Sequence, residues 1–458
     1  MALPEQPTDP RRPLERELER SVPDGFRIAV VGDCILTRPL SAIAERDEGL
    51  RGALERLRSA TLAVGNLETC IFEMRGFTGH PYSTGDWPLV AGPPVAEDLA
   101  GLGLRIVGRA NNHSMDWGPA GMRDTNRLLD RAGIAHAGTG ESLASALAPR
   151  YVETDGGRVA LVSVYSAESG DLSLALDQFG EAPGRPGVAG IRRSTTIRAP
   201  EEAMPILREI AERLDPDRTG AVGSWFGRPE GELPMLGVTF AQGDDFAVEH
   251  SFDAADVKAV LRSIRLGKQF ADLLVLNVHT HDEGPDAATP PRCLVDLARA
   301  AVDAGADVVA CHGVHRLAGI ELHRGSPILY GLGNFAFSDL AAPLTQMLYE
   351  QAGGLIPEVL GDRSQATDAD VTLLLSAQGF DDDRFFESVI AEIDYTNGEP
   401  SVRLVPIDLR YGEPLTQSGT PRLAQPEPAT AILERVDRLS RPLGAAVGAD
   451  GLVNASEG

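Results

Sequence analysis

The 458-residue sequence is poor in cysteine, in aromatic residues and in positive charge, and it lacks any long apolar run. Its four cysteines are too few for the disulfide framework that holds small secreted domains together. No run approaches the roughly 18 apolar residues of a membrane-spanning helix, and the polar, proline-rich N-terminal stretch contains no apolar core of a signal peptide. We therefore expect a cytoplasmic protein that does not insert into a membrane.

The charge balance argues against two classes of partner. Lysine and arginine number 42 against 67 aspartate and glutamate residues, so the formal net charge is −25 at pH 7. Nucleic acids and anionic membrane surfaces are bound non-specifically through a basic face, which so acidic a chain is not expected to have. The sequence therefore predicts no nucleic-acid partner, although a local basic pocket stays compatible with it.

The rest of the composition is typical of a globular, loop-rich α/β protein, 43% hydrophobic and 24% charged, with 49 glycines and 32 prolines. We expect three parts: a mobile N-terminal arm at residues 1–25, a main domain at residues 26–345, and a C-terminal segment at residues 346–458 packed on that domain. Within the main domain, residues 169–253 are irregular, and their length is typical of a lid or substrate loop. The C-terminal segment contains a hairpin at residues 388–409, turning at Asn397-Gly398, and a helix.

Five short apolar runs each end in polar residues, a pattern typical of buried parallel strands. The runs lie at residues 26–33, 61–68, 104–113, 272–279 and 307–312. Helical spacing follows at residues 119–132, where Asp116 is expected to cap the helix. Because the carboxyl ends of parallel strands share one edge of a sheet, this alternation predicts an α/β core with its polar residues gathered at that edge.

The polar residues at these strand ends are carboxylates, an amide and imidazoles. They are Asp33, Glu68, Asn112, His113, His279, His281, His312 and His315. A single Gly-Asp or His-x-His is common by chance, but such signals at five strand ends together indicate one site. Carboxylate with imidazole is the donor set of a first-row divalent metal, and Mg²⁺ or Ca²⁺ alone rarely recruits so many histidines.

Two longer motifs carry a resemblance to a known family. They are residues 109–118 (RANNHSMDWG) and residues 304–337 (AGADVVACHGVHRLAGIELHRGSPILYGLGNFAF), together with Gly32-Asp33 and Asn66-Leu67-Glu68. Residues 27–337 resemble the CapA-type poly-γ-glutamate capsule-synthesis family, which is similar to the calcineurin-like metallophosphoesterases. The resemblance implies a four-layer αββα sandwich of the metallophosphoesterase type, with two sheets between helices, irregular lid insertions and a dinuclear metal centre.

The resemblance also implies roles for single residues. The metal ligands that match by position are Asp33, Glu68, Asn112, His279, His312 and His315, holding one or two divalent ions such as Mn²⁺, Zn²⁺ or Fe. His113 matches the catalytic residue beside the metals. Three motifs depart from the family pattern: Asp33-Cys34-Ile35 lacks the histidine of Asp-x-His, His279-Thr-His281-Asp-Glu283 replaces His-Trp-Gly-x-Glu, and Cys311-His312-Gly-Val-His315 drops one histidine of Gly-His-His-Pro-His. His281 is therefore expected either to supply the missing ligand or to act as a second catalytic acid or base.

Several functions fit such a centre. With a metal-activated water or a metal-polarised carbonyl, a CapA-type enzyme would act on a peptide or γ-glutamyl amide. With a histidine that removes an α-proton, the same centre would make a cytoplasmic peptide epimerase of a natural-product pathway. The centre is also compatible with a phosphoesterase and with a non-catalytic scaffold for capsule synthesis. For substrate binding, Arg109, Arg192 and Arg193 are expected to hold a carboxylate or phosphate through paired hydrogen bonds.

Overall fold

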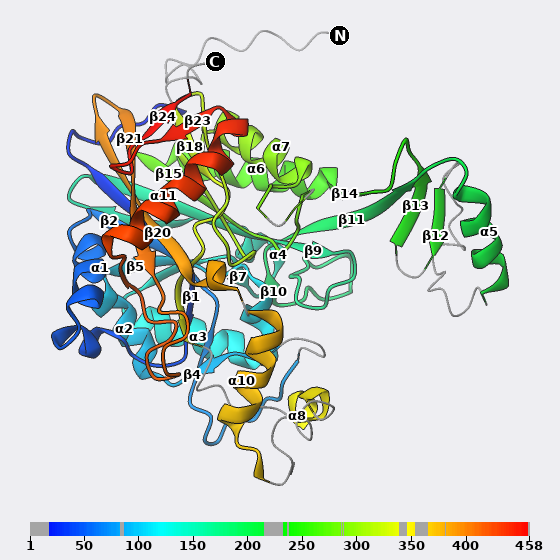
Figure 1. Cartoon of the computed structure of the whole chain (residues 1–458), viewed down its shortest axis with the longest axis horizontal. Helices are drawn as coiled ribbons and strands as arrows, with labels where there is room; N and C mark the ends of the chain where they lie inside the picture. The colour runs from blue at the N-terminus through cyan, green and yellow to red at the C-terminus, as the bar shows by residue number, and fades with distance from the viewer. Residues whose placement is uncertain are drawn as a thin grey trace.

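The computed structural model describes residues 18–82, 87–214, 232–235, 238–284, 286, 288–338, 346–352, 365–380 and 382–456. These residues form a mixed α/β body with two large sheets, from which an arm projects (Figure 1). The predicted α/β class is therefore confirmed. No helix in these ranges is both long enough and apolar enough to cross a bilayer. Of the expected N-terminal arm, residues 1–17 lie outside the described ranges, and residues 18–25 run along the body, where Arg20 pairs with Asp307.

The first sheet has eight strands in the described chain, in the order β22-β21-β20-β1-β2-β5-β6, with β19 also paired to β1. They are β1 (Arg27–Leu36), β2 (Leu62–Leu67), β5 (Leu104–Gly108), β6 (Ala135–Ala137), β19 (Asn334–Ser338), β20 (Glu387–Thr396), β21 (Glu399–Asp408) and β22 (Arg422–Leu423). Strands β1, β2, β5, β6 and β19 are parallel, whereas β20 runs antiparallel to β1. Since β20 and β21 form a hairpin across Asn397 and Gly398, the C-terminal segment completes this sheet.

The second sheet has ten strands in the described chain, in the order β12-β13-β11-β9-β15-β16-β18-β17, with β14 paired to β11 and β8 to β9. They are β8 (Arg150–Thr154), β9 (Gly157–Glu168), β11 (Gly190–Ala199), β12 (Glu232–Met235), β13 (Val238–Gln242), β14 (Ala247–Phe252), β15 (Leu273–His279), β16 (Val308–His312), β17 (Ile320–His323) and β18 (Ser326–Leu329). Its central strands β9, β15, β16 and β18 are parallel, so their carboxyl ends share one edge.

Helices cover the outer face of each sheet. On the first sheet lie α1 (Glu48–Arg58), α2 (Pro94–Leu102) and α3 (Gly118–Arg131), and on the second lie α4 (Leu143–Ala146), α6 (Ala254–Gln269) and α7 (Arg292–Asp303). Helix α11 (Pro426–Ser440) packs against the apolar layer between the sheets. Other described elements are α5 (Met204–Arg213), α8 (Gln346–Ala352), α10 (Asp368–Gly379), η2 (Ser41–Glu45), η3 (Asn112–Met115), η6 (Asp383–Phe386), η7 (Arg441–Leu443), and the strand pairs β3 (Cys70–Ile71) with β4 (Val90–Ala91), β7 (Thr139–Gly140) with β10 (Gly187–Val188), and β23 (Ala445–Val447) with β24 (Val453–Ala455).

Alternation of side chains along the strands explains this layering. In β1, Val30 packs between the two sheets, whereas its neighbour Val31 packs against the helices that cover the first sheet. In β15, Val275 likewise faces the space between the sheets and Leu276 faces α6 and α7. Strands that are buried on both faces read as continuous apolar runs, which is why the sequence pattern detected them.

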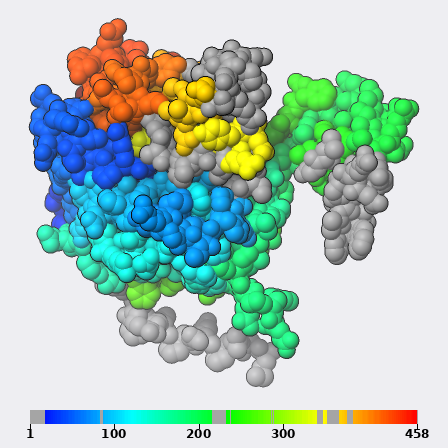
Figure 2. All heavy atoms as spheres, turned by 90° about the horizontal axis from the view of Figure 1, so that it is seen from below, coloured from blue at the N-terminus to red at the C-terminus, as the bar shows by residue number. Residues whose placement is uncertain are grey.

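The arm is more regular than the sequence predicted for residues 169–253. Strand β11 pairs with β9 at its start and then continues outward, where β13 and β14 pair with its two sides and α5 packs nearby (Figure 1). The space-filling view shows this arm standing apart from the body (Figure 2). Residues 215–231 and 236–237 of the arm lie outside the described ranges. The strands escape sequence reasoning because they are mostly polar and lie between stretches rich in glycine and proline.

Candidate metal centre

The carboxyl ends of the central strands from both sheets meet at one place. Asp33 lies in β1, at a shift in its register, and Glu68 directly follows β2. His279 and His312 are the last residues of β15 and β16, and they are paired in register. Asn112 and His113 begin η3, which follows β5. The structure brings together all eight residues that the sequence placed at strand ends.

Three histidines surround the Asp33 carboxylate, which is fully buried. Its Oδ1 lies 3.7 Å from His279 Nδ1 and 3.5 Å from His312 Nδ1, and its Oδ2 lies 3.4 Å from His315 Nδ1. Burial alone would raise the pKa of Asp33, but the adjacent imidazoles of His279, His315 and His312 hold that pKa well below its usual range. Burial also lowers the pKa of His312 to about 3, so its ring is neutral and can act as a ligand.

Glu68 is the residue whose surroundings point most directly to a cation. Its side chain is fully buried, and neither carboxylate oxygen has a hydrogen-bond partner among the described residues. Three imidazoles surround it, with His279 Nε2 at 3.6 Å and the Nε2 atoms of His113 and His315 both at 3.9 Å, and the Asp33 carboxyl also lies beside it. Burial and the charge of Asp33 raise the pKa of Glu68 well above its usual range. An unsatisfied buried carboxylate is costly, and a bound metal ion would remove that cost.

The remaining contacts join these residues into one continuous donor set. His279 Nε2 lies 3.0 Å from Asn112 Oδ1 and 3.1 Å from His281 Nε2. In the described chain, three overlapping groups have ligand atoms within 4.8 Å of one another: Asp33 with His279 and His312, Glu68 with His279 and His281, and Asp33 with Glu68 and His315. The donors are carboxylate oxygens and imidazole nitrogens, which suit a first-row divalent ion.

Asparagines that the sequence reasoning did not select hold this set in place. Asn66 Nδ2 donates to Asp33 Oδ1 at 2.8 Å, and Asn111 Nδ2 donates to Asn66 Oδ1 at 3.0 Å. Asn334 Oδ1 lies 2.8 Å from Nδ1 of His315, whose backbone adopts a left-handed conformation with φ of 55°. Asn66, Asn111 and Asn334 all stand within the family motifs, so their position was a usable signal. The pairing of β19 with β1 brings Asn334 to the site.

His113 is oriented by a carboxylate on its far side. Its Nδ1 lies 2.7 Å from Asp116 Oδ2, which also accepts a hydrogen bond from Leu89 N at 2.7 Å. Because of this contact, the proton of the neutral ring is assigned to Nδ1. The other nitrogen, Nε2, is directed toward Glu68. The expectation that Asp116 caps α3 is wrong: the cap position is Trp117, and the Asp116 side chain faces His113 instead.

The first motif, Asp33-Cys34-Ile35, lacks the histidine of the family pattern, and the positions of Cys34 and His281 show what stands near the cluster instead. Cys34 is buried in the apolar layer under α1 and α2, with Sγ 3.8 Å from Gly32 O, and it is in none of the donor groups of the described chain. His281 follows β15 by two residues, is exposed at the edge of the cluster, and contacts His279 through its Nε2 atom. This position is open to substrate as well as close enough to the cluster to bind a metal.

The three arginines expected to bind substrate are engaged in contacts within the protein. Arg109 is fully buried and donates to Thr69 O at 3.0 Å, so it has no surface to offer a substrate. Arg192 pairs with Asp256 at 2.8 Å, and Arg193 pairs with Glu168 and with Asp282, one residue after His281. Within the described residues, the hydrogen bonds and ion pairs of all three go to groups outside the cluster. Burial and local carboxylates, neither visible in the sequence pattern, account for the difference.

Comparison with known proteins agrees with this site. The family model described as bacterial capsule synthesis protein PGA_cap matches residues 27–339, which include the whole cluster. The chain belongs to the PGA_cap family. The predicted resemblance to CapA-type proteins is therefore confirmed.

Relatives of this PGA_cap chain match it over different lengths. The uncharacterized protein y4sH of Sinorhizobium fredii is 37% identical over 93% of this chain and 91% of its own length. The capsule biosynthesis protein CapA of Bacillus anthracis is 22% identical over 68% of this chain and 59% of its own length. A probable polyglutamine synthesis accessory protein of Mycobacterium tuberculosis is 27% identical over 53% of this chain and 47% of its own length.

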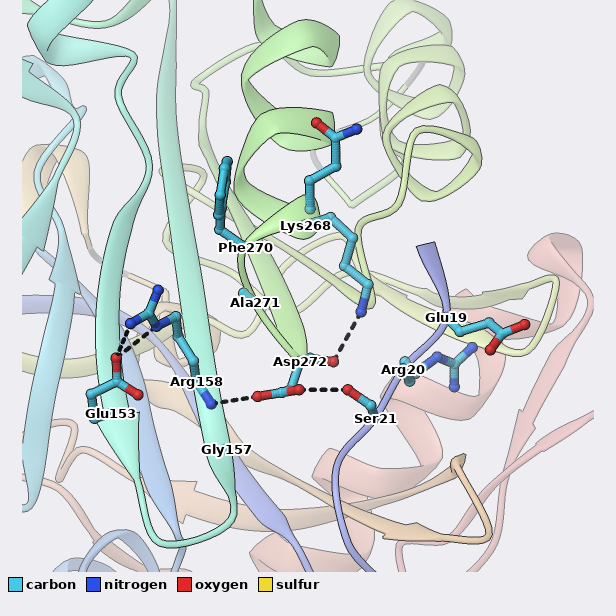
Figure 3. Close-up of a pocket in the computed structure, with 11 residues that line it drawn as sticks. Glu19, Arg20, Ser21, Glu153, Gly157, Arg158, Lys268, Phe270, Ala271 and Asp272 are labelled. Carbon is cyan, nitrogen blue, oxygen red and sulfur yellow. Dashed lines mark hydrogen bonds and ion pairs between the residues drawn. The ribbon is translucent and has the colours of Figure 1, made fainter. Parts of the chain in front are cut away.

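A wide hollow of about 1140 Å³ lies far from the cluster, at the amino ends of β9 and β15 (Figure 3). Several of its charged groups have local partners: Arg158 pairs with Glu153, and Asp272 accepts a hydrogen bond from Ser21. Lys268 points toward the backbone of Asp272. The residues that line the hollow include no histidine, so they do not form a donor set like that at the carboxyl ends of the strands.

Proposed function

We propose that this PGA_cap protein is a divalent-metal-dependent enzyme that hydrolyses a peptide or γ-glutamyl amide. The relative from Bacillus anthracis is named for capsule biosynthesis and the one from Mycobacterium tuberculosis for polyglutamine synthesis, and both names support a role connected with a glutamyl polymer. The observation that carries the proposal is Glu68, a buried carboxylate without hydrogen bonds among the described residues that faces three imidazoles. Two sheets packed face to face, with helices outside, also suit the αββα sandwich of the metallophosphoesterase type.

The residues that would hold the metal are those of the three donor groups, with Asn112 beside them. One or two ions bound there would lower the pKa of a bound water and polarise the substrate carbonyl. The protein's own part is to place these donors rigidly, through Asn66, Asn111 and Asn334.

Proton transfer falls to the histidines at the edge of the donor set. His113 presents Nε2 toward the cluster while Asp116 holds its Nδ1 proton, so Nε2 can take up or deliver a proton at the reacting atoms. His281, exposed at the rim, is in reach of substrate and can serve as a second acid or base, or complete a metal site. Hydrolysis needs one such group near the leaving nitrogen.

The metal is tested first. Elemental analysis of purified protein should show Mn, Zn or Fe, and adding Mn²⁺ or Zn²⁺ to chelator-treated protein should raise its melting temperature. Asp33→Ala and His279→Ala should each lose metal. His323→Ala is the matched control, because His323 lies in β17 and pairs with Asp303, outside the cluster. Absence of metal together with no thermal shift would refute the proposal.

The reaction is tested with a γ-glutamyl peptide in deuterated water. Cleavage without deuterium at an α-carbon identifies a hydrolase. Deuterium uptake without cleavage identifies the epimerase instead, and release of phosphate from a phosphoester identifies a phosphoesterase. Metal binding with none of these reactions would leave the scaffold role.

A further inference from the structure

An arginine-lined pocket of about 420 Å³ lies on the chain segments that follow two of the cluster histidines. Arg316, next to His315, lines it together with Asp286, which follows His281 by five residues. Three more arginines line it from the C-terminal segment, Arg384 in η6 and Arg435 and Arg438 in α11. Convergence of four arginines is unexpected in a chain with a net charge of −25, and it creates the local basic pocket that such a chain needs for an anionic ligand.

Local carboxylates pair with three of these arginines. The Arg316 guanidinium lies 3.6 Å from Asp382 Oδ2, Arg384 Nε donates to Asp382 at 2.6 Å, and Arg435 Nε lies 2.7 Å from Glu387 Oε2. Asp286 also lines the pocket, and the Asp437 carboxylate interacts electrostatically with Arg438. A structural ion-pair network therefore explains Arg384 and Arg435, whereas the carboxylates lie farther from Arg316 and Arg438.

Arg316 and Arg438 have binding capacity that the network does not use. The Arg316 guanidinium stacks 4.1 Å from the centre of the Phe385 ring, which fixes its plane, and its buried Nε has no hydrogen-bond partner among the described residues. Arg438 is exposed, and no carboxylate of the described chain lies within ion-pair distance of it. A guanidinium held in one plane at the wall of a pocket is suited to a planar, two-oxygen anion.

We propose that this pocket binds a carboxylate of an acidic peptide chain whose neighbouring amide lies at the metal centre. The volume is in the range of small-ligand sites, about 300–1000 Å³, and Leu317 and Leu439 line it for the methylene groups of a glutamyl residue. The role as a substrate subsite rests on the proposed function, whereas binding of the carboxylate itself does not.

Calorimetry with γ-linked triglutamate tests the pocket, using the fully amidated triglutamate as the neutral probe. The unmodified protein should bind triglutamate and bind the amide at least tenfold more weakly. Arg438→Ala should raise the Kd for triglutamate about tenfold, the usual effect of losing one charge-assisted contact. Arg441→Ala is the matched control, because Arg441 is ion-paired to Asp437 one turn away and does not line the pocket. Equal Kd values for the two variants, or for the two probes, would overturn the proposal.

Two further measurements distinguish a carboxylate from a phosphate ligand, and this pocket proposal from the proposed metal-dependent function. Inorganic phosphate that binds in an Arg438-dependent way, with no binding of triglutamate, would overturn the carboxylate assignment. In His279→Ala, triglutamate binding should remain sensitive to Arg438→Ala even if metal is lost, since the pocket does not include His279. Failure of the metal assay with this binding retained would refute the proposed function alone.

Discussion

The two ends of the central strands bury charge in opposite ways. At the amino end, Lys268 Nζ donates to Asp307 Oδ2 at 2.8 Å and to Asp272 O at 2.9 Å, while Leu274 N donates to Asp307 at 2.7 Å. At the carboxyl end, the Glu68 side chain is equally buried, but neither of its carboxylate oxygens has a hydrogen-bond partner among the described residues. One buried charge is satisfied by the protein, and the other is not.

This difference separates a structural ion pair from a binding site on physical grounds. Removing one partner of a satisfied pair leaves a buried charge uncompensated, so it should destabilise the folded protein strongly. Removing an unsatisfied buried charge should not destabilise the folded protein. It should weaken only the binding of the ligand that the charge contacts. Mutations at the two ends should therefore act on different measurements.

The largest effect is expected for His113→Ala, which should lower kcat about 10²–10⁴-fold, the usual contribution of a positioned acid or base. Metal content should stay unchanged, since His113 belongs to none of the donor groups found in the described chain. Asp116→Asn should lower kcat less, because it weakens only the orientation of the ring. If His113→Ala loses metal and activity together, His113 is a ligand and the assignment of roles is wrong.

Lys268→Met is expected to have the largest effect on folding. It removes the closer of the two cations beside the buried Asp307 and leaves Arg20 at 3.2 Å, so the free energy of unfolding should fall by up to about 3–5 kcal/mol in urea titrations. Lys258→Met is the control, because Lys258 is exposed on the same helix α6. Metal content should be normal in both variants. A loss of metal in Lys268→Met at temperatures where it is folded would contradict the separation of the two ends.

The sequence predicted those features of the fold and of the site that depend on residues close together in the chain. The central strands were predictable because burial on both faces produces continuous apolar runs, and their polar ends were visible as single residues such as Asp33 and His279. The rule that parallel strands share an edge predicted that these residues gather at one edge of a sheet, whereas the structure divides them between the edges of two sheets that meet at the cluster. Family motifs then supplied roles that spacing alone does not give.

Features that depend on contacts distant in sequence were not predictable. Asn334 meets Asp33 through the pairing of β19 with β1, and Arg438 meets Arg316 through the docking of α11. Asp116 had the pattern of a helix cap, and only the fold shows that its carboxylate turns to His113. Likewise, the sequence did not show that Arg109, which follows β5, is fully buried in the folded protein.

A smaller effect is expected from His136, a buried histidine outside the cluster. Burial, with the charge of Arg109, lowers the pKa of His136 from 6.5 to about 4, although Asp130 lies 3.2 Å away. Below pH 6.5 the unfolded chain takes up a proton that the folded protein refuses, so stability is lost as the pH falls from 6.5 to about 4. The loss should be on the order of 2–3 kcal/mol.

Melting temperatures measured between pH 7 and pH 4 in a chelator check this expectation. His136→Gln should flatten the profile, whereas His323→Gln, at a half-buried site beside Asp303, should leave it unchanged. An identical profile for the unmodified protein and His136→Gln would show that His136 does not contribute to the acid sensitivity.

The smallest and most discriminating effect concerns Glu68→Gln. Because burial and Asp33 raise the pKa of Glu68, the stability that its proton provides is full below the usual carboxyl pKa of 4.5 and is lost as the pH rises toward the raised value. Replacing Glu68 with glutamine removes that loss, so the metal-free variant should be more stable than the unmodified protein at pH 8, by about 1 kcal/mol. With Mn²⁺ present the order should reverse, because glutamine lacks the anionic oxygens that bind the ion.

Glu321→Gln provides the matched comparison for this substitution. Glu321 is also buried, but Arg299 and the Tyr330 hydroxyl each donate to it at 2.8 Å. Its replacement should lower stability with and without Mn²⁺, because it removes the charge that those donors need. A reversal with Mn²⁺ in Glu68→Gln but not in Glu321→Gln would identify Glu68 as a buried charge whose partner is the metal ion. Destabilisation of both variants in the chelator would instead make Glu68 a structural residue like Glu321.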